Sequence, residues 1–474
     1  MPLTAPTSTR PRRVLATVTA AQVVNVASTT IIAVALPDLG QELRASPTEL
    51  QWVVDAFVLV FASLLIAGGV AGDRYGRRRA LLAGLVVFAV GSLWCAVAPS
   101  IEWLLAGRVV QALGPPLTLP ASLAIVTATF TDPRARARAI GVWGAGSGVG
   151  LAIGPLLGGV LVDGLGWRWV FGVNVPVCAV LVALALAGVP RDRPARPDDR
   201  FDAGAAAMLT AALALLVFAL IEGRELGWGS APVLGAFAGS ALLGGAFVRR
   251  ELGHPAPLVD LRLLRQRAFF AANLGGATLY GALTATAVYV SVFLQQVQGR
   301  SALTAGLWLL PVGILTAACA PVAGRVMARA GARPPILAGL AAACVAFVAL
   351  LRLGPGTSFP EVWWAFALLG VGAGLALPPM TATAVGTVPT RQAGMASAIH
   401  NASRQVGQTF AVAILGTILF ARAGDAAEQR RPAAAAAVDW AAGLHLALLA
   451  AGGALACVAV AIAVLLPRGT AGAA

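Results

Sequence analysis

Long apolar runs, each bounded by charged or turn-forming residues, repeat along the chain. A helix needs about 20 apolar residues to cross the ~30 Å hydrocarbon core of a bilayer, and most of the runs reach that length. They lie at residues 14–36, 50–71, 80–98, 102–126, 139–162, 169–189, 203–221, 231–248, 269–294, 304–326, 335–352, 361–385, 396–420 and 442–466. The first is too long for a signal-peptide core. The pattern predicts an all-α integral membrane protein with about fourteen transmembrane helices.

Composition agrees with this pattern. Of the 474 residues, 58% are hydrophobic and 11% are charged, and the mean hydropathy is +0.83. Soluble domains carry roughly 25% charged residues, so lipid rather than water must surround most of this chain. The net charge of +14 comes from 34 arginines with no lysine. These arginines are scattered through short loops instead of gathering on one domain, which argues against nucleic-acid binding.

The arginines also fix an orientation. If the N-terminus is cytoplasmic and the runs alternate, 24 arginines fall on the cytoplasmic side, eight fall outside and two, Arg108 and Arg404, fall within spans. An excess of positive charge in cytoplasmic loops is the usual pattern of multi-span proteins. The sequence therefore predicts that both termini are cytoplasmic and that the protein lies in a plasma membrane.

Residues for enzymatic or metal chemistry are sparse. The five cysteines and three histidines lie singly, without the spacing of a metal site or a disulfide framework. No cluster of acids and histidines suits catalysis, and no loop has the spacing of a nucleotide-binding motif. We therefore expect no catalytic residue, no metal and no cofactor. A membrane-embedded enzyme or a sensor is the less favoured alternative, since no soluble segment exceeds about thirty residues.

An internal repeat divides the chain. The segment 69–85 reads GVAGDRYGRRRALLAGL, and 324–340 reads GRVMARAGARPPILAGL, with eight of seventeen positions identical. Parallel halves are typical of transporters that rock around a central site. The expected divisions are a cytoplasmic tail 1–13, a six-helix bundle 14–190, a linker with two extra helices 191–250, a second six-helix bundle 251–468 and a tail 469–474.

The first repeat carries a known signature. The segment Gly69-x-x-x-Asp73-Arg74-x-Gly76-Arg77-Arg78 closely resembles the turn between helices 2 and 3 of the major facilitator superfamily. Its glycines permit a tight turn and close helix packing, and its aspartate can form a charge network or lie at a helix N-terminus. The resemblance implies that these six residues form a latch that closes the cytoplasmic side in one conformation.

A second motif lies in the run 139–162. The segment 150–159 resembles the antiporter motif of the same superfamily, at Gly150, Gly154, Pro155, Gly158 and Gly159. Glycines three and four residues apart make a groove for a neighbouring helix, and a proline removes one backbone hydrogen bond and sets a bend. Within the superfamily this motif is associated with exporters that exchange substrate for protons.

Further segments resemble the fourteen-helix drug:proton antiporter family, the multidrug efflux branch. They are Arg108-Val-Val-Gln111-Ala-Leu-Gly114, the stretch 167–176, Phe201-Asp202 and Phe293-Leu-Gln-Gln296, together with the extra helix pair at 203–248. The resemblance covers nearly the whole chain and implies two six-helix bundles around a central path. One departure stands out: Ser28 occupies the position of the branch's helix 1 aspartate, which removes the usual coupling acid.

Asp55 and Arg108 are the candidates for proton coupling. A charge within the hydrocarbon costs ~2.5–3.5 kcal/mol on insertion scales, and Asp55 is the one acid that falls inside a predicted span and away from its ends. Asp55 and Arg108 follow Trp52 and Trp103 at similar depth, so Arg108 would favour the ionised carboxylate. The alternative is that Asp55 reaches water near the outer interface and takes no part in coupling.

Several polar side chains share faces of predicted spans and are candidates for a substrate cavity. They are Gln22, Asn25 and Thr29 in the first run, Gln111 in the fourth, Asn273, Tyr280 and Thr284 in the ninth, and Arg404 and Gln408 beside His400, Asn401 and Gln405 in the thirteenth. The alternative for each is a hydrogen bond that holds neighbouring helices together.

These observations predict a proton-coupled secondary transporter that exports small hydrophobic or cationic compounds, such as drugs, antibiotics or metabolites, by alternating access. The alternative is a proton-coupled carrier of one specific metabolite, which would either export or import it. The arginine- and alanine-rich composition is typical of a bacterial chain. The expected partners are a small-molecule substrate, protons and the lipid bilayer, with no nucleic acid, and the expected state is monomeric.

Overall fold

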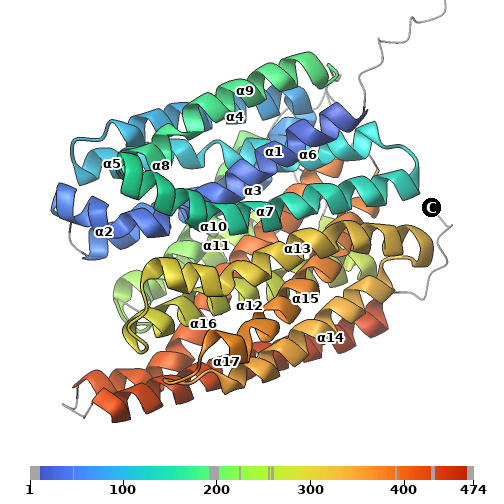
Figure 1. Cartoon of the computed structure of the whole chain (residues 1–474). Coiled ribbons are helices and arrows are strands. Elements are labelled where there is room, and N and C mark those ends of the chain that lie inside the picture. The colour runs from blue at the N-terminus through green and yellow to red at the C-terminus, as the bar shows by residue number, and fades with distance from the viewer. Residues whose placement is uncertain are drawn as a thin grey trace, which may run out of the picture.

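The computed structural model describes residues 11–45, 47–191, 202–223, 226–254, 257, 261–389, 392–428 and 433–466. These residues form a bundle of long helices that lie side by side, with no β-strand among them (Figure 1). The α-helices are α1 Pro11–Thr30, α2 Ile32–Leu43, α3 Pro47–Tyr75, α4 Arg77–Ala96, α5 Ile101–Ala112, α6 Pro115–Thr129, α7 Pro133–Leu165, α8 Arg168–Gly172, α9 Asn174–Gly188, α10 Ala203–Glu222, α11 Ala231–Gly253, α12 Arg267–Gln296, α13 Ala302–Ala330, α14 Arg333–Ala349, α15 Phe359–Gly386, α16 Ala393–Glu428 and α17 Ala433–Leu465. Two short 3₁₀ helices are η1 Leu261–Arg265 and η2 Leu350–Arg352.

Thirteen helical stretches of the described residues are long and apolar enough to cross a membrane. The α1–α2 run is less apolar because Gln22, Asn25 and Ser28 interrupt it, yet it contacts α7 along the bundle. Thirteen stretches and this run make the expected fourteen. The predicted all-helical membrane fold is confirmed, whereas the assignment of both termini to the cytoplasm stays a prediction.

Some predicted spans are not continuous helices. The run 102–126 is divided into α5 and α6 at Leu113 and Gly114, because Pro115 and Pro116 have no N–H to continue the α5 ladder. The run 169–189 is divided into α8 and α9 at Val173. By contrast, α7 is a single helix through position 155, and the side chain of Pro155 lies outside the described part of the structure.

The helices form two groups that pack against each other. Figure 1 shows α1–α9, coloured blue to green, on one side and α12–α17, coloured yellow to red, on the other. Between the groups, α7 packs against α13 and α15, and α3 and α6 pack against α16. We call α1–α9 the first half of the molecule and α12–α17 the second half.

The extra helix pair lies beside this interface. Helix α10 contacts both α3 and α16, whereas α11 packs mainly against α10. Asp202 caps α10 by accepting a hydrogen bond from the Ala205 N–H (2.8 Å), and it forms a two-point ion pair with Arg250 of α11 at 2.9 and 3.0 Å. The hydrogen bonds from Arg250 and Ala205 lower the pKa of Asp202. The expected division points at 190, 250 and 468 stay predictions.

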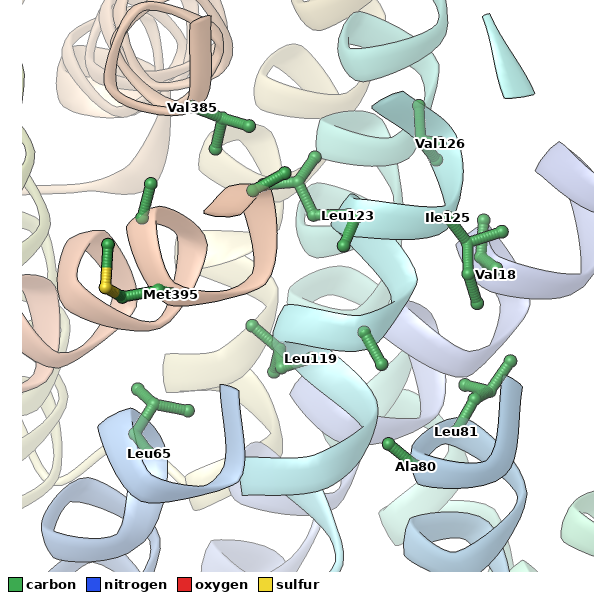
Figure 2. Packing of buried hydrophobic residues seen from close by; sticks show 14 of the residues in the cluster. Val18, Leu65, Ala80, Leu81, Leu119, Leu123, Ile125, Val126, Val385 and Met395 are labelled. Atoms are coloured by element: carbon green, nitrogen blue, oxygen red, sulfur yellow. The ribbon is translucent and has the colours of Figure 1, made fainter. Parts of the chain in front are cut away.

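One end of the bundle is closed by apolar packing across the halves. We call it the inner end: it carries Tyr75, Asp132 and the start of α16, and it is the end predicted to be cytoplasmic. Figure 2 shows Leu119 of α6 facing Leu65 of α3 and Met395 of α16, with Leu123 directed toward Val385 of α15. A continuous apolar core therefore joins the two halves at this end.

Candidate functional site

Asp73 joins the two halves at the inner end. Its side chain is 7% exposed and lies against the start of α16, where the first N–H groups have no carbonyl partner within their own helix. The Met395 N–H donates to Asp73 Oδ2 (2.9 Å), and the Gly394 N–H donates to Oδ1 (3.3 Å). The carboxylate also faces the positive end of the helix dipole, which favours an anion. Asp73 thus caps a helix that belongs to the other half.

Glycines make this approach possible. A Cβ on Gly394 would lie 2.6 Å from Asp73 Oδ1, inside contact distance. A Cβ on Gly69 would lie 2.3 Å from the Cβ of Ala398 and 2.8 Å from the Gly394 carbonyl oxygen. Any larger side chain at either position would push α3 and α16 apart.

The arginines of the predicted latch have separate partners. Arg77 Nε donates to Asp73 Oδ1 (3.1 Å), and its Nη1 donates to the Ala124 carbonyl of α6 (3.3 Å). Arg78 Nη2 donates to the Leu186 carbonyl of α9 (2.6 Å). Arg74 is half-buried, with its guanidinium 5.7 Å from the ring centroid of Tyr75. The expected charge network is therefore narrower than the motif indicates, with Arg77 as its cation.

The turn after Asp73 depends on Gly76. This residue has a φ of 105°, a conformation that L side chains rarely adopt, and it precedes the first residue of α4. It lets the chain reverse immediately after the latch, so that Arg77 returns to Asp73. The glycine positions of the motif, unlike Arg74, have a direct geometric reason.

Helix α7 presents glycines on two faces. Gly146, Gly150 and Gly154 face α1: a Cβ on Gly150 would lie 2.8 Å from the Val23 carbonyl oxygen, and one on Gly154 would lie 3.0 Å from that of Ala27. Gly141 and Gly148 face α13 of the second half, where added Cβ atoms would lie 2.8 Å from the Ala320 carbonyl oxygen and 2.6 Å from the Ala317 nitrogen. The antiporter motif, of which Gly158 is also buried and Gly159 half-buried, thus forms a groove for α1.

Arg108 is buried in the outer part of the first half. Its side chain is 1% exposed, and Nε donates to the Val53 carbonyl of α3 (2.8 Å) while Nη1 donates to Gln111 Oε1 (2.6 Å). Its guanidinium also lies 4.4 Å from the ring centroid of Phe57. Among the described residues no carboxylate forms an ion pair with it. A buried cation without such a partner is costly, so Arg108 stays the predicted cation of the coupling pair.

Asp55 follows Val53 by two residues on α3, so its backbone lies at the depth of Arg108. Its side chain lies outside the described part of the structure. The Asp55–Arg108 pair therefore stays a prediction.

The polar residues predicted in the first half form bonds between helices. Gln22 Nε2 donates to Ser147 Oγ of α7 (2.8 Å), and Asn25 Nδ2 donates to Thr118 Oγ1 of α6 (3.0 Å). Gln111 Nε2 donates to Ser92 Oγ of α4 (2.7 Å). Thr29 is exposed and donates to the Val26 carbonyl of its own helix. Gln22, Asn25 and Gln111 therefore also hold helices together, the alternative that the sequence left open.

Position 28 has a similar role. Ser28 Oγ donates to the Val24 carbonyl (2.7 Å) and lies 3.5 Å from Asn174 Oδ1 of α9. Both side chains are buried. The position that carries an acid in the resembled branch here provides a neutral contact between α1 and α9.

A second polar cluster lies in the second half, between α12, α15 and α16. The guanidinium of Arg404 lies 4.1 Å from the ring centroid of Tyr280, and His400 Nε2 lies 3.1 Å from Thr381 Oγ1. Three buried atoms have no protein partner within the described residues: His400 Nδ1, Arg404 Nε and Asn273 Oδ1. Such atoms cost free energy unless water or a ligand binds them.

The other predicted residues of the second half contact their own helix or are only half-buried. Asn273 Nδ2 donates to the Phe269 carbonyl (2.8 Å) and Thr284 to the Tyr280 carbonyl (2.9 Å), each within α12. Gln408 is half-buried on α16. The structure therefore brings Tyr280, Arg404 and His400 together, with Asn273 on the same helix as Tyr280.

The outer end of the first half is held by a separate contact. Arg168 Nη1 forms an ion pair with Glu42 of α2, and Trp167 Nε1 donates to the other carboxylate oxygen (2.7 Å). Arg168 Nη2 also donates to the Ala98 carbonyl (3.1 Å). The hydrogen bonds from Arg168 and Trp167 lower the pKa of Glu42.

Sequence reasoning misses two features of this site. Gly394 follows a short turn and belongs to no motif, so its role emerges from its distance to Asp73. The hollow formed by Arg134, Arg138, Arg325, Ala328 and Arg329 lies between the start of α7 and the end of α13, 191 residues apart as counted from Arg134 to Arg325. In the sequence these four arginines resemble the other positive charges near the ends of spans, and no local pattern shows that they converge.

Known proteins match this architecture over nearly the whole chain. The family model of the Major Facilitator Superfamily matches residues 18–412. The multidrug resistance protein Stp of Mycobacterium tuberculosis is 37% identical over 393 residues, which cover 82% of this chain and 72% of that protein. The methyl viologen resistance protein SmvA of Salmonella typhimurium is 34% identical over 393 residues, which cover 82% of this chain and 79% of that protein.

A solved structure shows the same fold. The crystal structure of the human organic anion transporter MFSD10 superposes with a TM-score of 0.69 at 17% identity, covering 96% of this chain and 99% of that one. The family and this neighbour are transporters rather than enzymes, and the bacterial relatives agree with a place in the bacterial cytoplasmic membrane. The chain therefore belongs to the major facilitator superfamily.

Proposed function

We propose that this chain exports small hydrophobic or cationic compounds in exchange for protons, by alternating access. The observation that carries the proposal is the capping of α16 by Asp73, because these bonds join the halves at the inner end and must break before that end can open. The relatives named for multidrug and methyl viologen resistance support this choice of substrates, and methyl viologen is itself an aromatic cation.

The packing of α7 against α13 supports the same cycle. Close contacts run from Ala137 and Gly324 at the inner end to Ala152 and Gly313 near the middle of α7. The glycines on the other face hold α7 to α1 within its own half. Helix α7 can therefore move with the first half as one body while its contact with α13 changes, which is how rocking transporters work.

The cluster around Arg404 is our candidate for substrate contact. Its unpartnered atoms include Arg404 Nε, a donor that favours an acceptor group such as a carbonyl or phenolate oxygen. They also include His400 Nδ1, which accepts a hydrogen bond when Nε2 carries the ring proton and donates it to Thr381 Oγ1. The Tyr280 ring adds an apolar surface. A cationic compound would instead need the carboxylate of Asp55, at the depth of Arg108 in the first half.

For coupling we propose that Asp55 takes up and releases the proton while Arg108 favours its ionised form. A proton or a cationic substrate, but not both, would then occupy the carboxylate. This competition would link inward proton movement to outward export.

The proposal is tested by expressing the chain in drug-sensitive bacteria and measuring ethidium and methyl viologen accumulation with and without a protonophore. We expect lower accumulation with the chain than without it, and loss of the difference when the proton gradient collapses. Asp55→Asn should behave like the empty vector despite normal membrane insertion. Accumulation that stays low under protonophore would contradict proton coupling, and unchanged accumulation across a broad panel would contradict drug export.

A further inference from the structure

The hollow at the inner end contains four arginines at the boundary between the halves. Arg134 and Arg138 come from the first turns of α7, and Arg325 and Arg329 come from the last turns of α13. The space they line has a volume of about 380 Å³. No described carboxylate lines it or pairs with any of the four. Four cations that face one another across an interface repel. Because no described carboxylate offsets this repulsion, the arginines destabilise the closed inner end unless an anion binds between them.

The internal repeat shows that this interface lacks a carboxylate that the equivalent interface has. The repeat that aligns Gly69 with Gly324 also aligns Asp73 with Ala328, which lines the hollow. A Cβ on Gly69 would lie 2.3 Å from Ala398, the sixth residue of α16; one on Gly324 would lie 3.3 Å from Cα of Arg138, the sixth residue of α7. The two interfaces are therefore related in register as well as in sequence. The first has a carboxylate that bridges the halves, and the second has alanine in its place.

The start of α7 does not replace the lost bridge. Its third residue, Ala135, corresponds to Met395 of α16, and the Ala135 N–H donates to Asp132 Oδ2 (2.7 Å). Asp132 directly precedes the same helix, so this bond stays within the first half. Nothing described in the hollow links α7 to α13 by a charge pair.

We propose that this hollow binds a phosphate group, which takes the place of the missing carboxylate and bridges the halves. Arginine suits phosphate because its planar guanidinium donates two parallel hydrogen bonds to the oxygens. A ligand that needs arginines from both α7 and α13 binds only when the inner end is closed, so it must stabilise that state by its binding free energy. This inference does not depend on what the chain transports.

The surroundings favour an anionic phospholipid of the inner leaflet as the source of the phosphate. One turn from Arg138, Val142 is 38% exposed, and three residues before Arg325, Val322 is 42% exposed. Exposed apolar side chains on a membrane protein face acyl chains, and arginines at their edge lie at headgroup level. A lipid whose headgroup fills the hollow could therefore lay its tails along these valines.

Binding is tested with the full chain in phosphatidylcholine nanodiscs, with and without phosphatidylglycerol, by native mass spectrometry of retained lipid. The Arg325→Gln/Arg329→Gln variant should retain phosphatidylglycerol about tenfold more weakly, because charged hydrogen bonds are lost. The control, Arg79→Gln/Arg249→Gln, removes the same charge from exposed inner-end positions and should match wild type. Equal retention by both variants would overturn a specific site.

Two further arms fix the source and guard against misfolding. In one arm, inorganic phosphate is added to discs of pure phosphatidylcholine, and the melting temperature of the protein is measured. If inorganic phosphate raises the melting temperature and phosphatidylglycerol does not, the phosphate does not come from a lipid. If neither ligand changes the melting temperature of wild type, the proposal is wrong. Ala328→Asp restores the carboxylate within the chain, so it should raise the melting temperature in phosphatidylcholine alone and reduce retained phosphatidylglycerol. An Ala328→Asp variant that binds the lipid as wild type does would contradict the bridging role.

Discussion

The backbone N–H of Met395 donates a hydrogen bond to the carboxylate of Asp73 over 322 residues of sequence, from one half of the molecule to the other. Because the donor is a main-chain group at a helix start, its position is fixed by α16 as a whole rather than by a side-chain rotamer. Any movement that separates α3 from α16 at the inner end must break this bond. The pair therefore reports directly on whether the inner end is closed.

Asp73→Asn should weaken this closure. The amide keeps one acceptor oxygen but loses the charge that faces Arg77 and the α16 dipole, so the closed state should lose about 1–3 kcal/mol. Spin labels at Arg79 and Pro389, both exposed at the inner end, measure the distance between the two halves in a cysteine-free background. We expect a longer distance population in the variant and slower export. Identical distance distributions in the two proteins would show that Asp73 is not a latch.

Gly394→Ala should produce the same opening with Asp73 intact. Its Cβ would lie 2.6 Å from the carboxylate oxygen, so α3 and α16 must separate or the carboxylate must turn away. Gly386→Ala is the matched control, because a Cβ at that helix end has nothing within 4 Å. The distance between the same two spin labels should increase in Gly394→Ala and stay unchanged in Gly386→Ala. If both variants kept the wild-type distance, the close approach of α16 would have no role in closure.

Gly150→Leu should destabilise the first half rather than open the inner end. Its side chain would meet the Val23 carbonyl and Val26 of α1, each 2.8 Å from the new Cβ, and overpacking of this kind costs about 1–3 kcal/mol. Gly164→Leu on the same helix has nothing within 4 Å of its Cβ. Thermal unfolding in detergent should show a lower melting temperature for the first variant alone. Equal melting temperatures would mean that the groove tolerates a larger residue.

The Glu42–Arg168 pair should stabilise the outer end in a pH-dependent way. The pKa of Glu42 is lower in the folded chain than in the unfolded chain, so its contribution is complete above the usual carboxyl pKa and is lost as pH falls through the lowered value. Both side chains are more than a third exposed, so we expect less than about 1 kcal/mol. The melting temperatures of wild type and Glu42→Gln should therefore differ slightly at neutral pH and converge in acid. A difference that grew toward acid pH would contradict the sign.

The sequence predicts the helices well because lipid imposes a simple rule. Every spanning segment must satisfy its own backbone and present apolar side chains, so run length and arginine placement reveal the spans. The errors fall where a local feature overrides this rule. Pro115 and Pro116 divide one span, and the polar residues of α1 make another less apolar than the rest.

The site is less predictable because its interactions cross between distant segments. The motif around Asp73 identifies the acid, the two flanking glycines and Arg77, yet Gly394 and the partner of Arg78 depend on tertiary packing. Gln22, Asn25 and Gln111 are recognisable as polar residues within spans, but their partners Ser147, Thr118 and Ser92 lie on other helices. Spacing along one helix cannot tell a substrate contact from such a bond.

The central claim is that a proton gradient drives export, and reconstituted transport tests it most directly. Purified chain in proteoliposomes with an acidic interior should accumulate methyl viologen through the molecules inserted with their inner end outward, and dissipating the pH difference should stop it. Asp55→Asn and Arg108→Gln should each abolish gradient-driven uptake, and the double variant should be no worse, as for two residues that act as one unit. Uptake at the same rate with and without the pH gradient would contradict the account.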